Sequence, residues 1–276
     1  MTESEMYVAR YLLDIEEFMD AENGEALLAR AFLRVDEERG EKARRMRPGR
    51  ARAASLGAGL LLQIGVREAV AAVSGDNIGI KRYSVKQLLE SLDGKPPVSL
   101  AYVYGKEGKP YFRDLPFYFN LSHSGGYVLC VISSEEIGAD IQQHCGKNVE
   151  KLARRFFSER EAAALEQAGE EREKREGLFY RLWARKEAYG KLTGKGIAAA
   201  LSADLLPGED VYPENLSEKA AASKNGSGPG RTLVPRGMAS ARGGAQMTTV
   251  RLDGKRLLWE EHDGIEGYSI ALCRYG

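Results

Sequence analysis

The stretch FYRLWARKEAYGKLTGKGI, residues 179–197, decides how the second half of the chain folds. An apolar stripe with i, i+4 spacing begins at Leu178 and runs to Leu192, which predicts one long helix packed against a core. Gly194 follows the stripe and predicts the C-cap that ends the helix. The segment is therefore expected to be part of the folded core.

Four Lys or Arg and one Glu lie within this helix. Successive residues rotate by about 100° around a helix axis, which puts Glu187 and Lys191 together on the face opposite the stripe and Lys186 near the stripe's edge. An exposed Glu-to-Lys pair would stabilise the helix by only a few tenths of a kcal/mol. The alternative is a helix that holds a metal ion and a phosphate, and this segment alone leaves both open.

The composition limits the classes of partner. The chain has 276 residues, 43% of them hydrophobic, which suffices for one large domain or two lobes with a shared core. Its 40 basic and 40 acidic residues cancel. A neutral protein is not a general binder of polyanions, so a phosphate or nucleic-acid site requires a local patch of charge.

The sequence predicts a cytoplasmic protein without a membrane partner. The first twenty residues are mixed and acidic, unlike a signal peptide, and residues 53–66 are too short and too polar to cross a bilayer. The three cysteines, Cys130, Cys145 and Cys273, are scattered and form no CxxC motif. They fit reduced thiols better than disulfides or a zinc site.

A first lobe is expected over residues 1–117. The patterns within it predict, in order, a strand at 7–15, helical segments at 20–47, an apolar helix at 51–73 and a Gly- and Pro-marked stretch at 94–119. No internal repeat is visible.

A second lobe is expected over residues 118–276. The run VLCVI, residues 128–132, predicts a buried strand, and IGADIQ, residues 137–142, predicts its return strand in a hairpin. The remaining patterns predict helices at 148–169 and 177–193, a long mobile loop at about 207–247 and two or three final strands.

Two acidic positions of the second lobe suit a metal ion. Asp140 lies in the predicted return strand, where it projects to the same side as Gln142, and Glu187 lies on the charged helix. Two carboxylates on separate rigid elements, completed by phosphate oxygens and water, are the usual ligands of Mg²⁺. Lys186 and Lys191 nearby would neutralise the phosphate oxygens, which favours Mg²⁺ with a polyphosphate over a structural metal.

A third acidic residue, Glu161, has two interpretations. Ser158 is a suitable N-cap and Glu161 follows three residues later, which is the spacing of a capping box. The same carboxylate is also a candidate general base or an aid to the metal ligands. The sequence leaves both open.

Other residues suit phosphate binding. His123 lies in the Ser- and Gly-rich sequence NLSHSGG, residues 120–126, which offers a ring N–H and backbone amides. Residues 39–52 hold seven Lys or Arg and one Glu, a local net charge of +6. Such a run is a solvated face or a nucleic-acid patch, although no aromatic residue is interleaved for base stacking. Lys109 adds a cation on a turn near the lobe junction.

Several motifs together resemble those of the 4'-phosphopantetheinyl transferases of the larger, two-lobed type, known as the Sfp type. In chain order they are GKP at 108–110, NLSHS at 120–124, GADI at 138–141, RFFSERE at 155–161, WARKEAYGK at 183–191 and GKG at 194–196. The resemblance covers residues 39–197 and, less closely, the last thirty residues.

The resemblance implies an α+β fold of two similar lobes related by a pseudo-twofold axis. Each lobe would be a small antiparallel sheet packed against a long helix, with an active-site cleft between them. The implied activity is transfer of 4'-phosphopantetheine from coenzyme A to a serine of an apo acyl or peptidyl carrier protein, with release of adenosine 3',5'-bisphosphate. The implied cofactor is Mg²⁺, and the family precedent favours a monomer.

The resemblance also implies roles for individual residues. Asp140 and Glu187 would bind Mg²⁺, and Glu161 would assist deprotonation of the carrier serine. The residues that would contact coenzyme A are Lys186 and Lys191 at the pyrophosphate, Arg39, Lys42 and His123 at the 3'-phosphate, and Arg52, Lys109 and Ser122 elsewhere in the nucleotide site. Position 142 differs from the family pattern, because many members carry Glu where this chain has Gln142. The amide oxygen of Gln142, or a water, would replace that carboxylate as a ligand. We therefore expect weaker metal binding.

Two alternatives to the transferase remain. A nucleotide- or RNA-binding protein would use the basic residues 39–52, with an affinity that falls steeply with salt and ignores magnesium. A lobe pair that serves only as a dock for carrier proteins would bind them without coenzyme A or metal.

Overall fold

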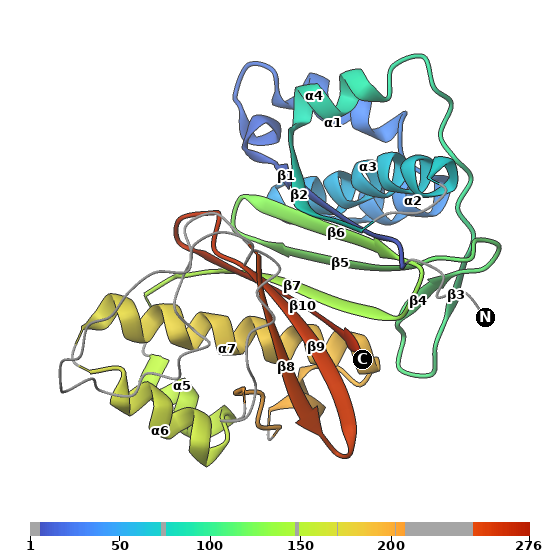
Figure 1. Cartoon of the computed structure of the whole chain (residues 1–276). Helices are drawn as coiled ribbons and strands as arrows, with labels where there is room; N and C mark the ends of the chain where they lie inside the picture. The colour runs from blue at the N-terminus through green and yellow to red at the C-terminus, as the bar shows by residue number, and fades with distance from the viewer. Residues whose placement is uncertain (1–5, 73–75, 147–148, 170, 202, 208–244) are drawn as a thin grey trace, which may run out of the picture.

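The computed structural model describes residues 6–72, 76–146, 149–169, 171–201, 203–207 and 245–276 (Figure 1). The predicted mobile loop at 207–247 lies mostly outside the described residues. Around that gap the chain forms two four-stranded sheets, one two-stranded sheet and flanking helices.

The first sheet has the strand order β2-β1-β6-β5. Its strands are β1 (Val8–Asp14), β2 (Asp76–Ser84), β5 (Tyr118–Ser124) and β6 (Tyr127–Ser133). β1 runs antiparallel to β6 but parallel to β2, so the expectation of a purely antiparallel sheet is wrong here. A short 3-10 helix and three α-helices connect β1 to β2 and return the chain to the same end of the sheet, which is the connection that parallel strands require.

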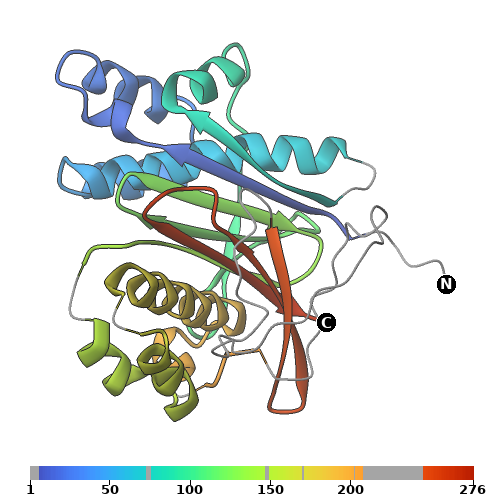
Figure 2. The same cartoon turned by 60° about the vertical axis from the view of Figure 1, so that its left-hand side comes forward.

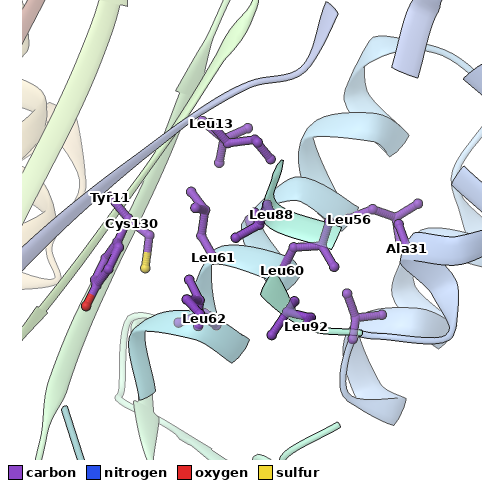
Figure 3. Packing of buried hydrophobic residues seen from close by; sticks show 14 of the residues in the cluster. Tyr11, Leu13, Ala31, Leu56, Leu60, Leu61, Leu62, Leu88, Leu92 and Cys130 are labelled. Atoms are coloured by element: carbon purple, nitrogen blue, oxygen red, sulfur yellow. The ribbon is translucent and has the colours of Figure 1, made fainter. Parts of the chain in front are cut away.

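Helices cover the outer face of the first sheet. They are η1 (Glu16–Met19), α1 (Gly24–Phe32), α2 (Glu37–Arg45), α3 (Arg50–Ala71) and α4 (Val85–Ser91), and a small hairpin of β3 (Tyr102–Tyr104) and β4 (Pro110–Phe112) follows. Figure 3 shows the leucines of α3 between Tyr11 and Leu13 of the sheet and Ala31 of α1, with Leu88 of α4 next to them. The strand predicted at 7–15 and the helix predicted at 51–73 are confirmed, whereas β2 and α4 were not predicted.

α3 is the one described helix whose length and composition would allow it to cross a membrane. Within the fold, 83% of the most apolar 18-residue stretch of this helix is buried. The helix is therefore the central helix of the first core, and its apolar residues are explained by the sheet and helices around it.

The second sheet has the strand order β7-β10-β9-β8 and is antiparallel throughout. Its strands are β7 (Ile137–Gln143), β8 (Ala245–Leu252), β9 (Lys255–His262) and β10 (Tyr268–Tyr275). The predicted hairpin between residues 128–132 and 137–142 is wrong, because β7 pairs with β10. Both edges of β6 are already occupied by β1 and β5.

This pairing also places the division between the two sheets. β5 and β6 belong to the first sheet, so the division falls between Ser133 and Ile137 and not at the expected lobe boundary of 117/118. We use "first lobe" for the first sheet with its helices and the β3–β4 hairpin, and "second lobe" for the chain from Ile137 onward.

In its described part, the second lobe adds the helices α5 (Val149–Phe156), α6 (Glu159–Gln167), α7 (Arg172–Thr193) and α8 (Ile197–Ala200). The predicted C-cap is confirmed, since Gly194 ends α7 in the left-handed conformation with φ of 71°. Ala184, Ala188 and Leu192 of α7 pack on the outer face of the second sheet, around Trp259.

The two sheets pack face to face, which produces four layers in the order helix, sheet, sheet, helix (Figure 2). The shared core consists of Val8, Leu12, Leu129 and Val131 from the first sheet and Ile137, Ala139, Ile141, Ile270 and Leu272 from the second. Apolar side chains of β7 alternate toward this core, so Gly138, Asp140 and Gln142 face α7.

Both lobes repeat one plan, as the fold class predicted. In each, a first strand is followed by a 22-residue helix, α3 or α7, and later by a hairpin whose last strand pairs with the first strand. The shared orders are β1-β6-β5 and β7-β10-β9, with β2 and β8 as additional edge strands. The prediction of two similar lobes is thus confirmed.

Gly138 sets the distance between α7 and β7. A Cβ atom at this position would lie 2.0 Å from the carbonyl oxygen of Ala188 and 2.6 Å from the amide nitrogen of Leu192. Because these are backbone atoms of a packed helix, they cannot move aside as the end of a flexible side chain can. Only glycine lets α7 approach β7 closely enough for the contacts described below.

We expect Gly138→Ala to reduce the free energy of unfolding by about 1–3 kcal/mol, because overpacking forces the backbone to shift. Gly177→Ala in α7 is the matched control, since a Cβ there meets nothing within 4 Å and alanine favours a helix by about 1 kcal/mol. Urea denaturation measures both variants. Equal stability of the two variants would contradict the close approach.

Candidate active site

The edge strands β5 and β7 of the two sheets lie side by side and are joined by side chains. The Asn120 amide donates its Nδ2–H to the carbonyl of Ile137 at 3.4 Å, and its Oδ1 accepts the N–H of Ala139 at 3.2 Å. Further along, Ser124 Oγ accepts the N–H of Gln143 at 3.0 Å. The predicted NLSHS and GADI motifs therefore meet across the two lobes.

Asp140 lies at the centre of this junction and is only 4% exposed. Its Oδ1 accepts hydrogen bonds from Ser122 Oγ at 2.5 Å and from Lys191 Nζ at 2.7 Å. Lys191 Nζ also donates to the carbonyl of Ala139 at 3.2 Å. Three elements, β5, β7 and α7, thus converge on one carboxylate.

The other oxygen of Asp140, Oδ2, is buried and has no hydrogen-bond partner within the described part of the chain. An unpaired buried carboxylate oxygen is costly. A cation bound at Oδ2 would remove that cost.

Glu187 shares the space near Asp140. It lies one helical turn before Lys191 and is partly buried, so burial raises the pKa of its carboxyl group. The negative charge of Asp140 raises that pKa further, while Lys191 lowers it. Two carboxylates that repel each other beside an unpaired oxygen are a suitable donor set for a divalent cation.

The described residues add few further protein ligands. No group of three or more His, Cys, Asp or Glu side chains suited to a metal is found among them. Gln142 lies on the same face of β7 as Asp140, but its side-chain amide donates to the carbonyl of Gln143 at 3.3 Å. Asp140 and Glu187 are therefore the principal candidate ligands, and phosphate or water oxygens would have to complete the coordination.

The raised pKa of Glu187 makes the site sensitive to pH. In the metal-free protein the folded state binds this proton more readily than the unfolded state. The stabilisation that results is fully present below the ordinary glutamate pKa and is lost as pH rises through the raised folded value. Above that value Glu187 is ionised and able to bind a cation.

We therefore expect added Mg²⁺ to stabilise the fold more at neutral than at mildly acidic pH, because protons compete with the ion at Glu187. In metal-free protein, Glu187→Gln should remove part of the decline in stability as pH rises, and it should weaken the effect of Mg²⁺. Urea denaturation across this pH range, with and without Mg²⁺, measures both effects. A Mg²⁺ effect that ignores pH would exclude Glu187 as a ligand.

Predicted phosphate-binding residues lie around the same junction. His123 is exposed on β5, yet the surrounding protein removes enough water to lower the pKa of its imidazole. The positive charges of Lys191 and Lys42 lower that pKa further, and Asp140 opposes them. Lys42 on α2 and Lys191 on α7 therefore each lie close enough to His123 for their charges to act on it.

Arg39 and Arg52 make different contacts in the structure. Arg39 lies on α2 one turn before Lys42, beside Asp36, and its charge opposes the burial that raises the pKa of the Asp36 carboxyl group. Arg52 lies over the ring of Phe32, 4.9 Å from its centroid. Within the described residues, Arg52 forms no hydrogen bond or ion pair with Asp140 or Lys191, so its expected place in the nucleotide site stays a prediction.

A cation-lined cleft of about 340 Å³ opens between the lobes. The turn before β4, the middle of β5 and the end of α7 line it, and its cations are Lys109, Lys191 and Lys195. Lys109 Nζ donates to the carbonyl of Leu192 at 2.8 Å, and burial lowers the pKa of this lysine. The predicted cleft between the lobes is thus present beside Asp140.

Lys186 and Glu161 form a buried pair away from this cleft. Both side chains are 0% exposed, and Lys186 Nζ lies 2.8 Å from Glu161 Oε2. The ammonium group also donates to the carbonyls of Ala200, Leu201 and Ala203 at 2.6–3.2 Å. Its three N–H donors are therefore fully used, which leaves none for the phosphate that the resemblance implies.

Glu161 is the third residue of a capping box. Ser158 Oγ accepts the Glu161 N–H at 3.2 Å, and Glu161 Oε2 accepts the Ser158 N–H at 2.9 Å, which confirms the first of the two interpretations. The other oxygen, Oε1, accepts the N–H of Leu205 at 3.0 Å. A general base needs a carboxylate oxygen that can reach the substrate proton, and Glu161 presents none in this structure.

A second buried cluster was missed from the sequence. Arg185 is fully buried and donates to the carbonyl of Leu205, Thr248 Oγ1 and Glu261 Oε2 at 2.6, 2.6 and 2.7 Å. It also lies over the ring of Trp259. The two acidic residues that directly follow the apolar run LLW at 257–259 were the sequence signal for a buried cation partner.

Three consecutive residues of α7 thus point in three directions. Arg185 faces β8 and β9, Lys186 faces α6 and the segment after α8, and Glu187 faces Asp140. Buried charged side chains have few alternative partners, so the first two fix the rotation of the helix about its axis. That rotation presents Glu187 and Lys191 to β7.

Comparison with known families agrees with this geometry. Residues 136–223 match the family model of the 4'-phosphopantetheinyl transferase superfamily, a region that contains Asp140, Glu187 and Lys191. The resemblance indicated by the motifs is confirmed as a similarity: residues 136–223 are similar to that superfamily, and Sfp-type relatives align with part of the chain.

Individual relatives agree. The chain is 36% identical over 119 residues to a 4'-phosphopantetheinyl transferase of Bacillus pumilus, covering 43% of this chain and 50% of that protein. It is 40% identical over 95 residues to the 4'-phosphopantetheinyl transferase Sfp of Bacillus subtilis, covering 34% and 41%. It is 31% identical over 159 residues to a 4'-phosphopantetheinyl transferase of Aneurinibacillus migulanus, covering 56% and 63%. The chain therefore spans about half the length of the curated relatives it matches.

Proposed function

We propose that the protein transfers the 4'-phosphopantetheine group of coenzyme A to a serine of an apo acyl or peptidyl carrier protein, with Mg²⁺ as cofactor. The observation that carries the proposal is the Asp140 carboxylate, held by Ser122 and Lys191 at a cation-lined cleft, with one buried oxygen that no described residue pairs. The match of residues 136–223 to the transferase superfamily supports it.

The residues fit a divalent ion. Asp140 Oδ2 and the Glu187 carboxylate would hold Mg²⁺, with Gln142 or a water in the position where many relatives carry a carboxylate. When bound, the ion would neutralise charge on the diphosphate and polarise its oxygens. Lys191 bonds to the same carboxylate and lines the cleft, so it would neutralise further phosphate oxygens.

The remaining contacts to coenzyme A are assigned from where the basic residues lie around the cleft. His123 and Lys42, which both belong to the first lobe and lie close enough for their charges to interact, would bind the 3'-phosphate, with Arg39 on the same helix as Lys42. Lys109 lines the cleft and would contact the nucleotide. Lys186 would support the helix that carries Glu187, since its donors are already occupied.

In the proposed reaction the hydroxyl oxygen of the carrier serine attacks the phosphorus that bears the pantetheine. The O–H bond breaks and its proton passes to solvent, because Glu161 is buried and already bonded. The bond between that phosphorus and the bridging oxygen of the diphosphate breaks, and adenosine 3',5'-bisphosphate leaves with the electron pair. Such displacements depend mainly on positioning and charge neutralisation, which the cleft lysines supply.

Mass spectrometry of a panel of apo carriers tests the proposal. After incubation with coenzyme A, Mg²⁺ and the protein, at least one carrier should gain the mass of phosphopantetheine. The same carrier with its serine changed to alanine, and a reaction with EDTA, should gain none. A panel that a known transferase modifies and this protein leaves unmodified would refute the activity.

The basic segment 39–52 keeps RNA binding as the alternative. An RNA-binding protein would show an affinity for single-stranded RNA that falls steeply with salt and does not depend on Mg²⁺. Lys42 and Lys191 each act electrostatically on His123, and this link between the basic segment and the candidate active site favours coenzyme A over RNA as the ligand of the segment.

We further infer a cytoplasmic monomer, from the burial of α3 within the core and from the family precedent. Light scattering that showed a stable dimer would contradict the monomer.

A further inference from the structure

The two sheets meet at β5 and β7 without a backbone ladder between these strands in the described structure. The side chain of Asn120 forms hydrogen bonds that a backbone ladder between the two strands would otherwise form. Its amide presents an acceptor to the N–H of Ala139 and a donor to the carbonyl of Ile137, as the backbone of a neighbouring strand would. Asn120 is 7% exposed, so these bonds are shielded from water.

The bond to Ala139 fixes the backbone directly before Asp140. The N–H of Ala139 is held by Asn120, and the carbonyl of the same residue accepts from Lys191. Two residues further along β5, Ser122 bonds to Asp140 itself. β5 therefore holds the backbone of β7 through Asn120 and the carboxylate of Asp140 through Ser122.

We propose that Asn120 is a positioning residue that sets the place of the Asp140 carboxylate relative to Glu187 and to the first lobe. The proposal rests on the proposed function, because it assigns Asn120 to the ion site used there. Asn120 acts through the backbone of Ala139 and leaves the reacting atoms to other groups. Its loss should weaken ion binding and lower kcat, with little change in the KM for the carrier protein.

A purely structural role would have a different consequence. Ser124 also joins β5 to β7, through the N–H of Gln143, but on the far side of Asp140. Ser124→Ala removes one bond between the lobes and leaves the backbone at Ala139 untouched. It is therefore the matched control for Asn120→Ala, and Asn120→Ser serves if the alanine variant does not fold.

The experiment titrates Mn²⁺ into the full chain with coenzyme A present and follows the free ion by electron paramagnetic resonance. We expect Asn120→Ala to raise the Kd for Mn²⁺ about tenfold or more, as loss of a group that orients a ligand does. Ser124→Ala should stay within about twofold of the wild type even where it lowers the Tm. The same variants are assayed for kcat and for the KM of the carrier.

The outcomes separate the two proposals. Wild-type affinity for Mn²⁺ in both Asn120 variants, or equal losses in Asn120→Ala and Ser124→Ala, would overturn the positioning role. A wild-type chain that binds no Mn²⁺ would also overturn it. If Asn120→Ala weakens Mn²⁺ binding while the wild type modifies no carrier, the positioning role stands and the proposed transferase activity fails.

Discussion

Asp140→Asn is expected to abolish labelling of an apo carrier protein by a fluorescent coenzyme A, with a loss of about a thousandfold or more. The substitution removes one of two carboxylates at the ion site and sets an N–H₂ donor where a cation would bind. Removal of one preorganised electrostatic contact at a reacting centre costs about 10²–10³ in rate, and loss of the ion would add to it.

The fold should survive this change. Asparagine keeps the shape of the side chain, and its Oδ1 still accepts from Ser122 and Lys191. The Tm should therefore stay near that of the wild type. Asp93→Asn is the matched control, because Asp93 pairs with Arg30 and Arg34 on the surface of the first lobe and should leave labelling unchanged. Full labelling by Asp140→Asn would remove the basis of the proposed mechanism.

Glu161→Ala is expected to reduce the free energy of unfolding by about 3–5 kcal/mol, the cost of removing one partner from a buried ion pair. The substitution leaves the Lys186 ammonium buried without its counter-charge. It also leaves the N–H groups of Ser158 and Leu205 without their acceptors. Urea denaturation with analysis of the m-value measures the change.

Two further variants make this prediction specific. The double variant Glu161→Leu with Lys186→Met should recover part of the loss, because apolar side chains of similar volume can replace a buried pair. Glu159→Ala is the control, since Glu159 is exposed in the first turn of the same helix and should change stability by less than about 0.5 kcal/mol. A loss below about 1 kcal/mol in Glu161→Ala would show that the pair is not a structural element.

Glu161→Gln separates the cap from the general base. Glutamine keeps the length of the side chain and can still accept a backbone N–H, so the helix cap should persist. Loss of a general base lowers the rate by about 10²–10⁴. We expect a much smaller change, because Glu161 lies away from the cleft and both of its oxygens are bonded. A large fall in kcat with unchanged stability would restore the general-base role.

The local patterns of the sequence predicted the elements that depend on neighbours in the chain. The apolar stripe from Leu178 to Leu192 and the cap at Gly194 define most of α7, and the Ser158 and Glu161 pair defines the start of α6. These features depend on periodicity and on contacts three or four residues apart, which a single sequence displays.

The pairing of the strands could not be predicted in the same way. Whether β6 pairs with β7 or with β1 is decided by residues more than a hundred positions away, and no local pattern distinguishes the two. β10, at the end of the chain, is the strand that takes β7. The division between the sheets was misplaced for the same reason.

The site shows the same limit. The angular position of Lys186 placed it near the edge of the apolar stripe, but its partners come from α6 and from the segment after α8. Arg185 likewise depends on β8 and β9. The motifs indicated Asp140, Ser122 and Lys191 as site residues. In the structure, Ser122 and Lys191 both lie within hydrogen-bond distance of the Asp140 carboxylate.

A divalent ion held by Asp140 beside the diphosphate of coenzyme A should couple magnetically to phosphorus. Mn²⁺ bound to the chain in the presence of coenzyme A is examined by electron–nuclear double resonance for coupling to ³¹P. We expect one Mn²⁺ per chain with clear ³¹P coupling, and loss of that species in Asp140→Asn. Mn²⁺ that binds equally well to the variant, or that shows no coupling to phosphorus, would contradict it.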